Sequence, residues 1–531
     1  MNAYCTLDAS TVAAASVPQP WTYADAAPYL PDREYPELRG KVATGTERNV
    51  AYELVREAAR QLGLDAALYG SPDWNPLGDI VRPGDNVVVK PNLVRHFHLG
   101  SGDYQAVVTH GSIIRAVLDY VALALSRDEP ATQEDVKGRA HGERESGRRP
   151  LKGRGRITVG DAPIQSADFE TLLRRTGLKE VCRDVSDTWQ IAVGLEDFRL
   201  LRVTLDEHHR VIDLGVPEGN PAGAAAVDLG RRSLLVGIGG DSERFRVTNY
   251  DAAAMGRCHN EQTHRYFVSR RVLEADVVIS LPKLKTHRKA GMTAALKNLV
   301  GICGHKDCLP HHRRGSAAEG GDEYRGRSTL KRFQTRLHEA IDCVPRSRLN
   351  PLRRLAVRIA GRLGRRTWPD PFVEGSWYGN DTLWRTVLDL NRILLYADRN
   401  GRITDVPQRR GLSLVDALIA GEGEGPMLPD ARPCGLLVAG QNPVAVDAAL
   451  ATMIGFDYTR IPLIARALEL TDLPLADFSA EQVEIISDDA RLAGLAVGDY
   501  CDALRFRPSS GWVGQVESTR HDSPTQVVQH V

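Results

Sequence analysis

The stretch ADVVISLPKLKTH (residues 275–287) decides the fold that we predict for this chain of 531 residues. Its apolar run at 277–281 is typical of a strand buried on both faces, as in a parallel sheet covered by helices. Pro282 ends the run, and Lys283, Lys285 and His287 then alternate, which predicts that their side chains share one face of extended backbone. Cations placed directly after a buried strand indicate a binding site for an anion.

Three further segments combine an apolar run with polar residues at its end: DNVVVKPNLV (85–94), GRITVGDAPI (155–164) and CGLLVAGQNPVAVDAALATMIG (434–455). Helical patterns lie between the runs, at 109–126 with Thr109 as the expected N-cap and at 166–177 with Ser166 as the expected N-cap. This alternation predicts an α/β fold with a mainly parallel sheet covered by helices, two lobes with a central crevice, and some β-hairpins. Ligands of such folds bind outside the carboxyl ends of the strands.

The chain is too long for one ordinary core, so we divide it into consecutive segments. We expect an irregular lead-in at 1–40, an α/β lobe at 41–245 with a flexible insertion at 127–156, the segment that carries the site at 246–343, a basic amphipathic linker or helix at 344–370, a second α/β lobe at 371–507, and a disordered tail at 508–531. Hairpins are expected within 201–214 and around Asn400-Gly401.

The composition limits the choice of partners. Lys plus Arg and Asp plus Glu number 68 each, so the net charge is zero and any basic site must be local. Aromatic residues make up 6% of the chain and do not alternate with basic ones, so we expect no nucleic-acid partner. The eight cysteines form no CxxC, which argues against a disulfide scaffold and a ferredoxin-type cluster, and the sequence lacks a Rossmann or Walker A motif for nucleotide cofactors. A cytoplasmic protein is expected, because no signal peptide or membrane-spanning run is apparent.

Two groups of residues carry the expected chemistry. Lysines that point into a crevice hold phosphate or carboxylate as point charges, and glycines let backbone amides approach a ligand. We therefore predict a substrate site formed by Lys90, Asn92, Lys283, Lys285, Lys297, Asn298 and Gly425, with His287, Asp161 and Asp447 as catalytic candidates.

Histidines and acids form the second group. His305, Asp307, His311 and His312 lie close together in the sequence and could hold a divalent transition metal, although no known metal motif matches their spacing. These histidines are equally suited to binding an anionic substrate or to acid–base catalysis.

Several phrases resemble the DUF362 family: VVVKPNLV, VTHGSIIRAVLDYV, ITVGDAP, DVVISLPKLKTH, ALKNLVG, VDALIAGEGEGP and NPVAVDA occur in that family's order, over roughly 80–470. The resemblance implies that Lys90, Asn92, Asp161, Lys283, Lys285, His287, Lys297, Asn298, Asp416, Gly425 and Asp447 belong to a shared site, without assigning a reaction. Other phrases are similar to a branch found in bacterial gene sets for polysaccharide or secondary metabolism. Many relatives carry a fused ferredoxin-like module, which this chain lacks.

Together these observations favour an enzyme of biosynthetic metabolism that acts on an anionic small molecule by metal-assisted or acid–base chemistry. Group transfer, elimination and hydrolysis all stay open. The alternatives are a metal-binding redox protein without a ferredoxin-type cluster, and a protein that binds a membrane surface or polyanion through the arginine-rich segment 344–366.

Overall fold

The computed structural model describes residues 7–127, 155–205, 211–238, 242–247, 252–342, 355 and 372–519. Nearly all of the predicted insertion at 127–156 lies outside these residues, and so does the basic segment 344–366 except for Leu355. Among the described residues, no helix combines the length and the apolar character needed to cross a membrane.

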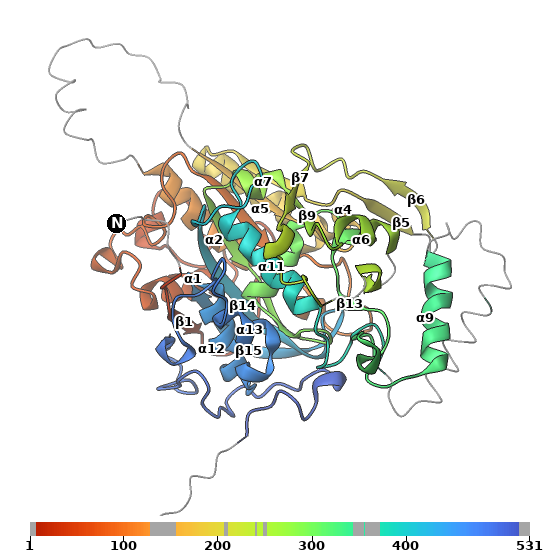
Figure 1. Ribbon diagram of the computed structural model, residues 1–531. Coiled ribbons are helices and arrows are strands. Elements are labelled where there is room, and N and C mark those ends of the chain that lie inside the picture. Colours follow the sequence, from red (N-terminus) through yellow and green to blue (C-terminus); the bar gives the residue numbers. More distant parts are fainter. Residues whose placement is uncertain are drawn as a thin grey trace, which may run out of the picture.

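A ten-stranded sheet forms the centre of the protein (Figure 1). Its main path runs β16 (Glu484–Ile486), β1 (Thr11–Ser16), β15 (Leu428–Gly440), β14 (Arg410–Glu424), β10 (Val277–Leu281), β2 (Asn86–Pro91), β3 (Arg156–Asp161) and β4 (Val193–Asp197). All neighbours from β14 to β4 are parallel, whereas β15 is antiparallel to both β14 and β1. The predicted α/β class with a mainly parallel sheet is confirmed, and the strands of both expected lobes join this one sheet.

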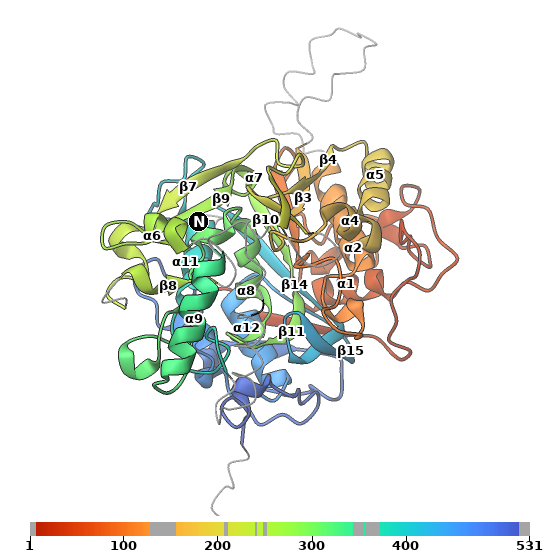
Figure 2. The ribbon, with the colours of Figure 1, turned by 90° about the vertical axis from the view of Figure 1, so that its right-hand side faces the viewer.

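Helices cover both faces of the sheet because the parallel strands are apolar on both sides. Val87 and Val89 of β2 face α1 (Val50–Gln61), α2 (Gly111–Ser126), α4 (Phe169–Thr176) and α5 (Leu178–Trp189). Val88 faces the opposite way, where α8 (Ala295–Asn298), α11 (Leu383–Tyr396), α12 (Pro443–Met453) and α13 (Pro462–Leu468) form the second layer. Figure 2 shows α1, α2, α4 and α5 on one side of the strands and α8, α11 and α12 on the other.

Smaller elements lie around the second layer. The strands β7 (Ala224–Asp228) and β9 (Arg265–Ser269) pair with each other near α6 (Ala252–Cys258) and α7 (Arg270–Glu274), and β8 (Phe245–Arg246) pairs with β13 (His312–Arg313). The helix α9 (Thr329–Asp342) stands at the edge of the molecule (Figure 1). The predicted hairpin within 201–214 is confirmed as β5 (Arg202–Leu205) and β6 (Val211–Gly215).

Both expected helix caps are wrong by one or two residues. The N-cap of α2 is His110, because the hydroxyl of Thr109 instead donates to Leu281 O at 2.6 Å and accepts from Asn92 N at 3.0 Å. The N-cap of α4 is Asp168, whose carboxylate accepts from Thr171 N at 3.1 Å, and Ser166 lies outside the helix. In each helix, the N-cap is the residue whose side chain accepts a backbone N–H of the first turn.

Other segments also differ from expectation. The lead-in at 1–40 contains β1, an internal strand of the sheet, and residues 508–519 of the expected tail fold back onto the core, where Trp512 is buried and donates to Arg288 O at 2.8 Å. The turn at Gly401 closes a single bridge between Ala397 and Ile403 and forms no hairpin strands. The glycine-rich run after Asp416 belongs to β14, which continues to Glu424 and pairs with β15.

Candidate functional site

The predicted site lies where the order of the parallel strands reverses. Along the chain, β2 is followed by β3 and β4, which lie in this order on one side of β2. The later strands β10 and β14 lie on its other side. Lys90, Asp161 and Ser280 stand at the carboxyl ends of β2, β3 and β10, and β11 (Lys283–His287) continues directly from β10. A crevice at such a reversal is the usual ligand site of open α/β sheets.

Lys90 is fully occupied by neighbouring groups. Its buried ammonium pairs with Asp161 Oδ1 at 2.8 Å and donates to Asn298 Oδ1 at 2.9 Å and Pro91 O at 2.8 Å. Burial lowers the pKa of Lys90, and the adjacent Asp161 opposes that shift. Since an ammonium has three donors, Lys90 has none left for a ligand.

The partners of Lys90 are themselves held in place. Asp161 also accepts from Leu93 N at 2.7 Å and Ala162 N at 2.9 Å. The amide of Asn298 donates to Lys90 O at 3.0 Å and to Ser280 Oγ at 2.9 Å. Gly301 lies so close that a Cβ there would stand 1.8 Å from Asp161 Oδ1. This unit therefore fixes β2, β3 and α8 relative to one another.

Lys283 is also saturated. Its ammonium donates to Asp416 Oδ2 at 2.7 Å, to the Tyr23 hydroxyl at 2.7 Å and to Ile419 O at 3.1 Å. Asp416 in turn accepts from the Tyr23 hydroxyl at 2.6 Å and from His110 N at 3.0 Å, and the rings of Tyr23 and His110 stack at 4.0 Å. Burial, followed by Asp416, raises the pKa of Tyr23 well above its usual value, so its hydroxyl stays protonated.

Four other lysines, Lys285, Lys289, Lys297 and Lys306, form what we call the cation cluster. Among the described residues, Lys285 donates to Val107 O at 2.5 Å and Lys306 to Val300 O at 3.1 Å, and these are the only hydrogen bonds of the two ammonium groups. The ammonium of Lys297 makes no hydrogen bond or ion pair within the described part of the chain, and its side chain is partly exposed. Lys285, Lys297 and Lys306 thus carry N–H donors that no acceptor among the described residues fills.

The lysines of the cation cluster repel one another. Burial lowers the pKa of Lys297 to about 7, and the charged neighbours that add to this shift are Lys306, Lys289 and Lys90. Burial also lowers the pKa of Lys289 and of Lys306 to about 8 in each case. For Lys285, burial lowers the pKa well below its usual value, and Lys283 and Lys297 add to the shift.

The acids near the cluster differ from one lysine to the next. Asp161, which favours the charged forms of Lys285 and Lys306, is the partner of Lys90. For Lys289, the acid that most favours the charged form is Glu374, followed by Asp322, which accepts from the Thr382 hydroxyl at 2.5 Å and from Asp381 N at 3.0 Å. The charged groups that shift the pKa of Lys297 are all lysines, whereas acids oppose the shift of Lys289.

His287 and His311 lie beside the cluster as neutral imidazoles. Nδ1 of His287 accepts from Lys289 N at 3.0 Å and from Ala290 N at 3.2 Å, which places the ring proton on Nε2. Nδ1 of His311 lies 2.7 Å from Leu309 O and must donate to it, which leaves Nε2 as an acceptor. Burial, followed by nearby lysines, lowers the pKa of His287 well below its usual value and that of His311 to about 3.

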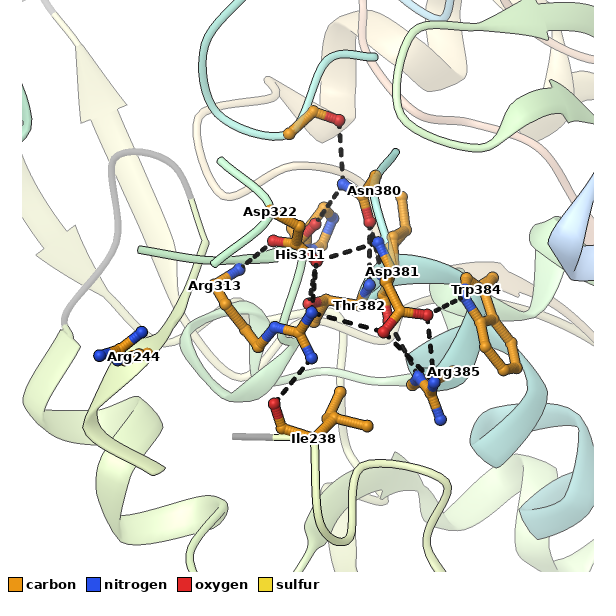
Figure 3. A network of polar contacts seen from close by, with 12 residues as sticks. Ile238, Arg244, His311, Arg313, Asp322, Asn380, Asp381, Thr382, Trp384 and Arg385 are labelled. Carbon is orange, nitrogen blue, oxygen red and sulfur yellow. Dashed lines mark hydrogen bonds and ion pairs between the residues drawn. The ribbon is translucent and has the colours of Figure 1, made fainter. Parts of the chain in front are cut away.

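A polar network holds the segment that carries His311 (Figure 3). Asn380 donates through Nδ2 to His311 O and to Gly375 O, both at 2.9 Å. Asp322 accepts from the backbone N–H of Arg313, two residues further on. Sequence patterns did not reveal this network, because its members lie far apart in the chain: His311 and Asn380 are 69 positions apart, and Ile238 and Arg313 are 75 apart.

Three other predicted residues have backbone roles. The carboxylate of Asp447 accepts from Ala295 N at 2.7 Å and Leu296 N at 3.1 Å, and so caps α8, which carries Lys297; burial raises its pKa to about 7. Asn92 N donates to Leu281 O at 3.1 Å. Gly425 accepts from Arg288 N at 3.1 Å, and a Cβ on it would stand 1.9 Å from Thr286 O.

The predicted metal ligands do not converge in the described part of the chain, where no group of three or more His, Cys, Asp or Glu side chains could hold a metal ion. His305 Nδ1 lies 3.7 Å from Asp307 Oδ2, and His312 Nδ1 is buried without a partner. The metal site stays a prediction. Nearby, a disulfide joins Cys258 of α6 to Cys308.

Sequence reasoning missed four residues of the site. Lys289 and Lys306 lie in the same lysine-rich stretch as Lys285 and Lys297, so their spacing could have included them. Nothing in the sequence pointed to Tyr23 or His110. His110, on which Tyr23 stacks, lines a separate cavity of about 610 Å³ together with His98, Asp103, Tyr104 and Arg175.

Comparison with known proteins gives a family match without a function. Residues 211–452 match the family described as "Domain of unknown function (DUF362)", which confirms the resemblance over this region. No curated protein matches the chain. A crystal structure from Thermotoga maritima, a structural genomics target, is 11% identical with a TM-score of 0.27; the match covers 74% of this chain and 57% of that one, so the chain spans little more than half of its length.

Proposed function

We propose that this protein is an enzyme that binds a phosphate- or carboxylate-bearing small molecule at the cation cluster. The observation that carries the proposal is the set of donors on Lys285, Lys297 and Lys306 that no acceptor among the described residues fills, while the nearby Asp161 is already the partner of Lys90. Unpaired cations removed from water are unfavourable, so an anion that accepts from them gains strong, charge-assisted hydrogen bonds.

The two histidines provide for chemistry on the bound molecule. His287 can donate from Nε2 to an oxygen of the substrate, and His311 can accept a proton at Nε2. Because burial and lysine charges keep both rings neutral, they retain these opposite roles at neutral pH. A bound anion would raise the proton affinity of His311 and so strengthen it as a base.

Titration calorimetry with inorganic phosphate, pyrophosphate and citrate tests the proposal. Wild-type protein is expected to bind at least one of these anions saturably, with affinity reduced tenfold or more in Lys297→Met, since a hydrogen bond to a charged group contributes about 1.5–3 kcal/mol. Lys41→Met, at an exposed position, is the matched control and should bind like wild type. Absence of saturable binding, or equal binding by both variants, would contradict the proposal.

The expected divalent transition metal has a separate test. Elemental analysis of protein purified without chelators, on wild type and on a variant with His311→Ala and His312→Ala, measures whether these histidines hold a metal. Stoichiometric metal lost in the variant would add metal-assisted chemistry to the proposed mechanism.

A further inference from the structure

Lys297 differs from every other lysine at the site. Lys297 is the most exposed of the four, because Lys285, Lys289 and Lys306 are buried residues. It also makes no hydrogen bond or ion pair within the described residues, so neither a carboxylate nor a carbonyl holds its ammonium in the charged form.

The backbone under Lys297 is rigidly placed. Asp447 caps the start of α8 through Ala295 N and Leu296 N, and the amide of Asn391 donates to Leu296 O at 3.0 Å. The next residue, Asn298, is bound to both Lys90 and Ser280. A short helix fixed at four points thus presents an amine that itself has no structural partner.

From this arrangement we infer that Lys297 is a nucleophilic amine that condenses with the carbonyl group of an anionic substrate, such as a 2-oxo acid or a phosphorylated aldehyde or ketone. The inference rests on the proposed function, in which the cation cluster binds the carboxylate or phosphate of that substrate. Burial and the surrounding lysines lower the pKa of Lys297 to about 7, so a large fraction of the amine is neutral near pH 7.

The bond changes balance with the groups present. The lone pair of Nζ attacks the carbonyl carbon, a C–N bond forms, and the carbonyl π electrons move to oxygen. His311 Nε2 accepts a proton from the attacking nitrogen and passes it to the oxygen, which gives a carbinolamine. His311 then takes the second proton of the nitrogen and delivers it to the same oxygen, the C–O bond breaks, water leaves, and the nitrogen lone pair forms the C=N bond of an imine.

Reductive trapping tests the inference directly. Pyridoxal 5′-phosphate is a suitable probe because it carries both an aldehyde and a phosphate, and sodium borohydride converts its imine into a stable amine that mass spectrometry locates. At pH 7.5 we expect one adduct per chain, on Lys297, formed several hundredfold faster than on surface lysines, because an ordinary lysine with pKa near 10.4 is only about 0.1% neutral there. Inorganic phosphate should slow this labelling.

Variants and a pH profile complete the test. Lys297→Met and Lys297→Arg should lose the adduct, while Lys41→Met should keep it. In wild type, trinitrobenzenesulfonate labelling of Lys297 should rise with a midpoint near pH 7, which requires no variant to fold. Label spread evenly over surface lysines, or a midpoint above pH 9, would overturn the inference. If phosphate binds at the cluster but no adduct forms, the inference fails and the proposed function stands; if neither occurs, both fail.

Discussion

Lys283 and Lys297 belong to the same lysine-rich stretch and to the same end of the sheet, but their surroundings are opposite. Lys283 is fully buried, pairs with Asp416, and gives all three donors to protein oxygens. Lys297 is partly exposed, and the charges around it are those of Lys306, Lys289 and Lys90. Lys283 therefore stabilises the fold through its ion pair, whereas the charged groups around Lys297 are all cations.

The difference shows how a buried cation can be assigned to structure or to ligand binding. A lysine kept for stability is expected to come with a carboxylate and a full set of acceptors, as Lys90 and Lys283 do. Cations that repel one another lower the stability of the empty protein, and selection retains such groups where function requires them. Opposite responses to the same substitution therefore provide the sharpest test of this comparison.

The largest effect is expected from Lys283→Met. The substitution leaves the carboxylate of Asp416 buried without its cation, and breaking a buried ion pair in this way costs about 3–5 kcal/mol. Urea denaturation should show this loss in the free energy of unfolding. Adding Asp416→Asn removes the stranded charge and keeps an acceptor for Tyr23 and His110, so the double variant should recover a large part of it. A loss below about 1 kcal/mol in the single variant would mean that the pair does not stabilise the fold.

A smaller effect of opposite sign is expected from Lys297→Met. Removing one of several mutually repelling cations should stabilise the empty protein by about 1 kcal/mol, in the range typical of substitutions that relieve a functional strain. The same denaturation experiment measures it, and the identical Lys-to-Met change at 283 is the internal control. Destabilisation of both variants to the same extent would remove the distinction between the two lysines.

Much of the fold could be predicted because its signals are local. The apolar runs of β2, β3 and β10 are visible in the sequence, and the polar residues that follow them do lie at the carboxyl ends of parallel strands. The segment 291–301 has a helical residue pattern, but Gly291–Thr293 pairs with β11 and the α-helix is limited to Ala295–Asn298. The first residues of the segment form a strand because they pair with β11 across a turn. The helical residue pattern does not indicate such a pairing.

The sequence indicated which residues lie at the candidate site better than it indicated what each residue does there. The sequence grouped Lys283 with Lys285 and Lys297 because all follow one strand, yet the partners that saturate Lys283 lie 260 positions away at Tyr23 and 133 positions away at Asp416. Asp447 appeared to be a catalytic acid, and its carboxylate accepts two backbone N–H groups of α8. Long-range contacts of this kind leave no trace in residue spacing.

A further expected effect is a difference in pH dependence between wild type and Lys297→Met. The pKa of Lys297 is about 7 in the folded protein and near 10.4 in an unfolded chain, so between these pH values the unfolded state binds more protons. The free energy of unfolding should therefore rise with pH from about 7 to 10 through this group, and the rise should be smaller in the variant.

The measurement is chemical denaturation at several pH values, with and without saturating phosphate. Lys289 and Lys306, whose pKa values are each about 8, add a rise of the same sign to both proteins, so the informative quantity is the difference between wild type and variant. A bound phosphate should reduce that difference, because an anion beside Lys297 restores the pKa of its ammonium toward the ordinary value. Identical pH profiles for the two proteins would show that Lys297 is not held among uncompensated charges, and the contrast with Lys283 would then reduce to burial alone.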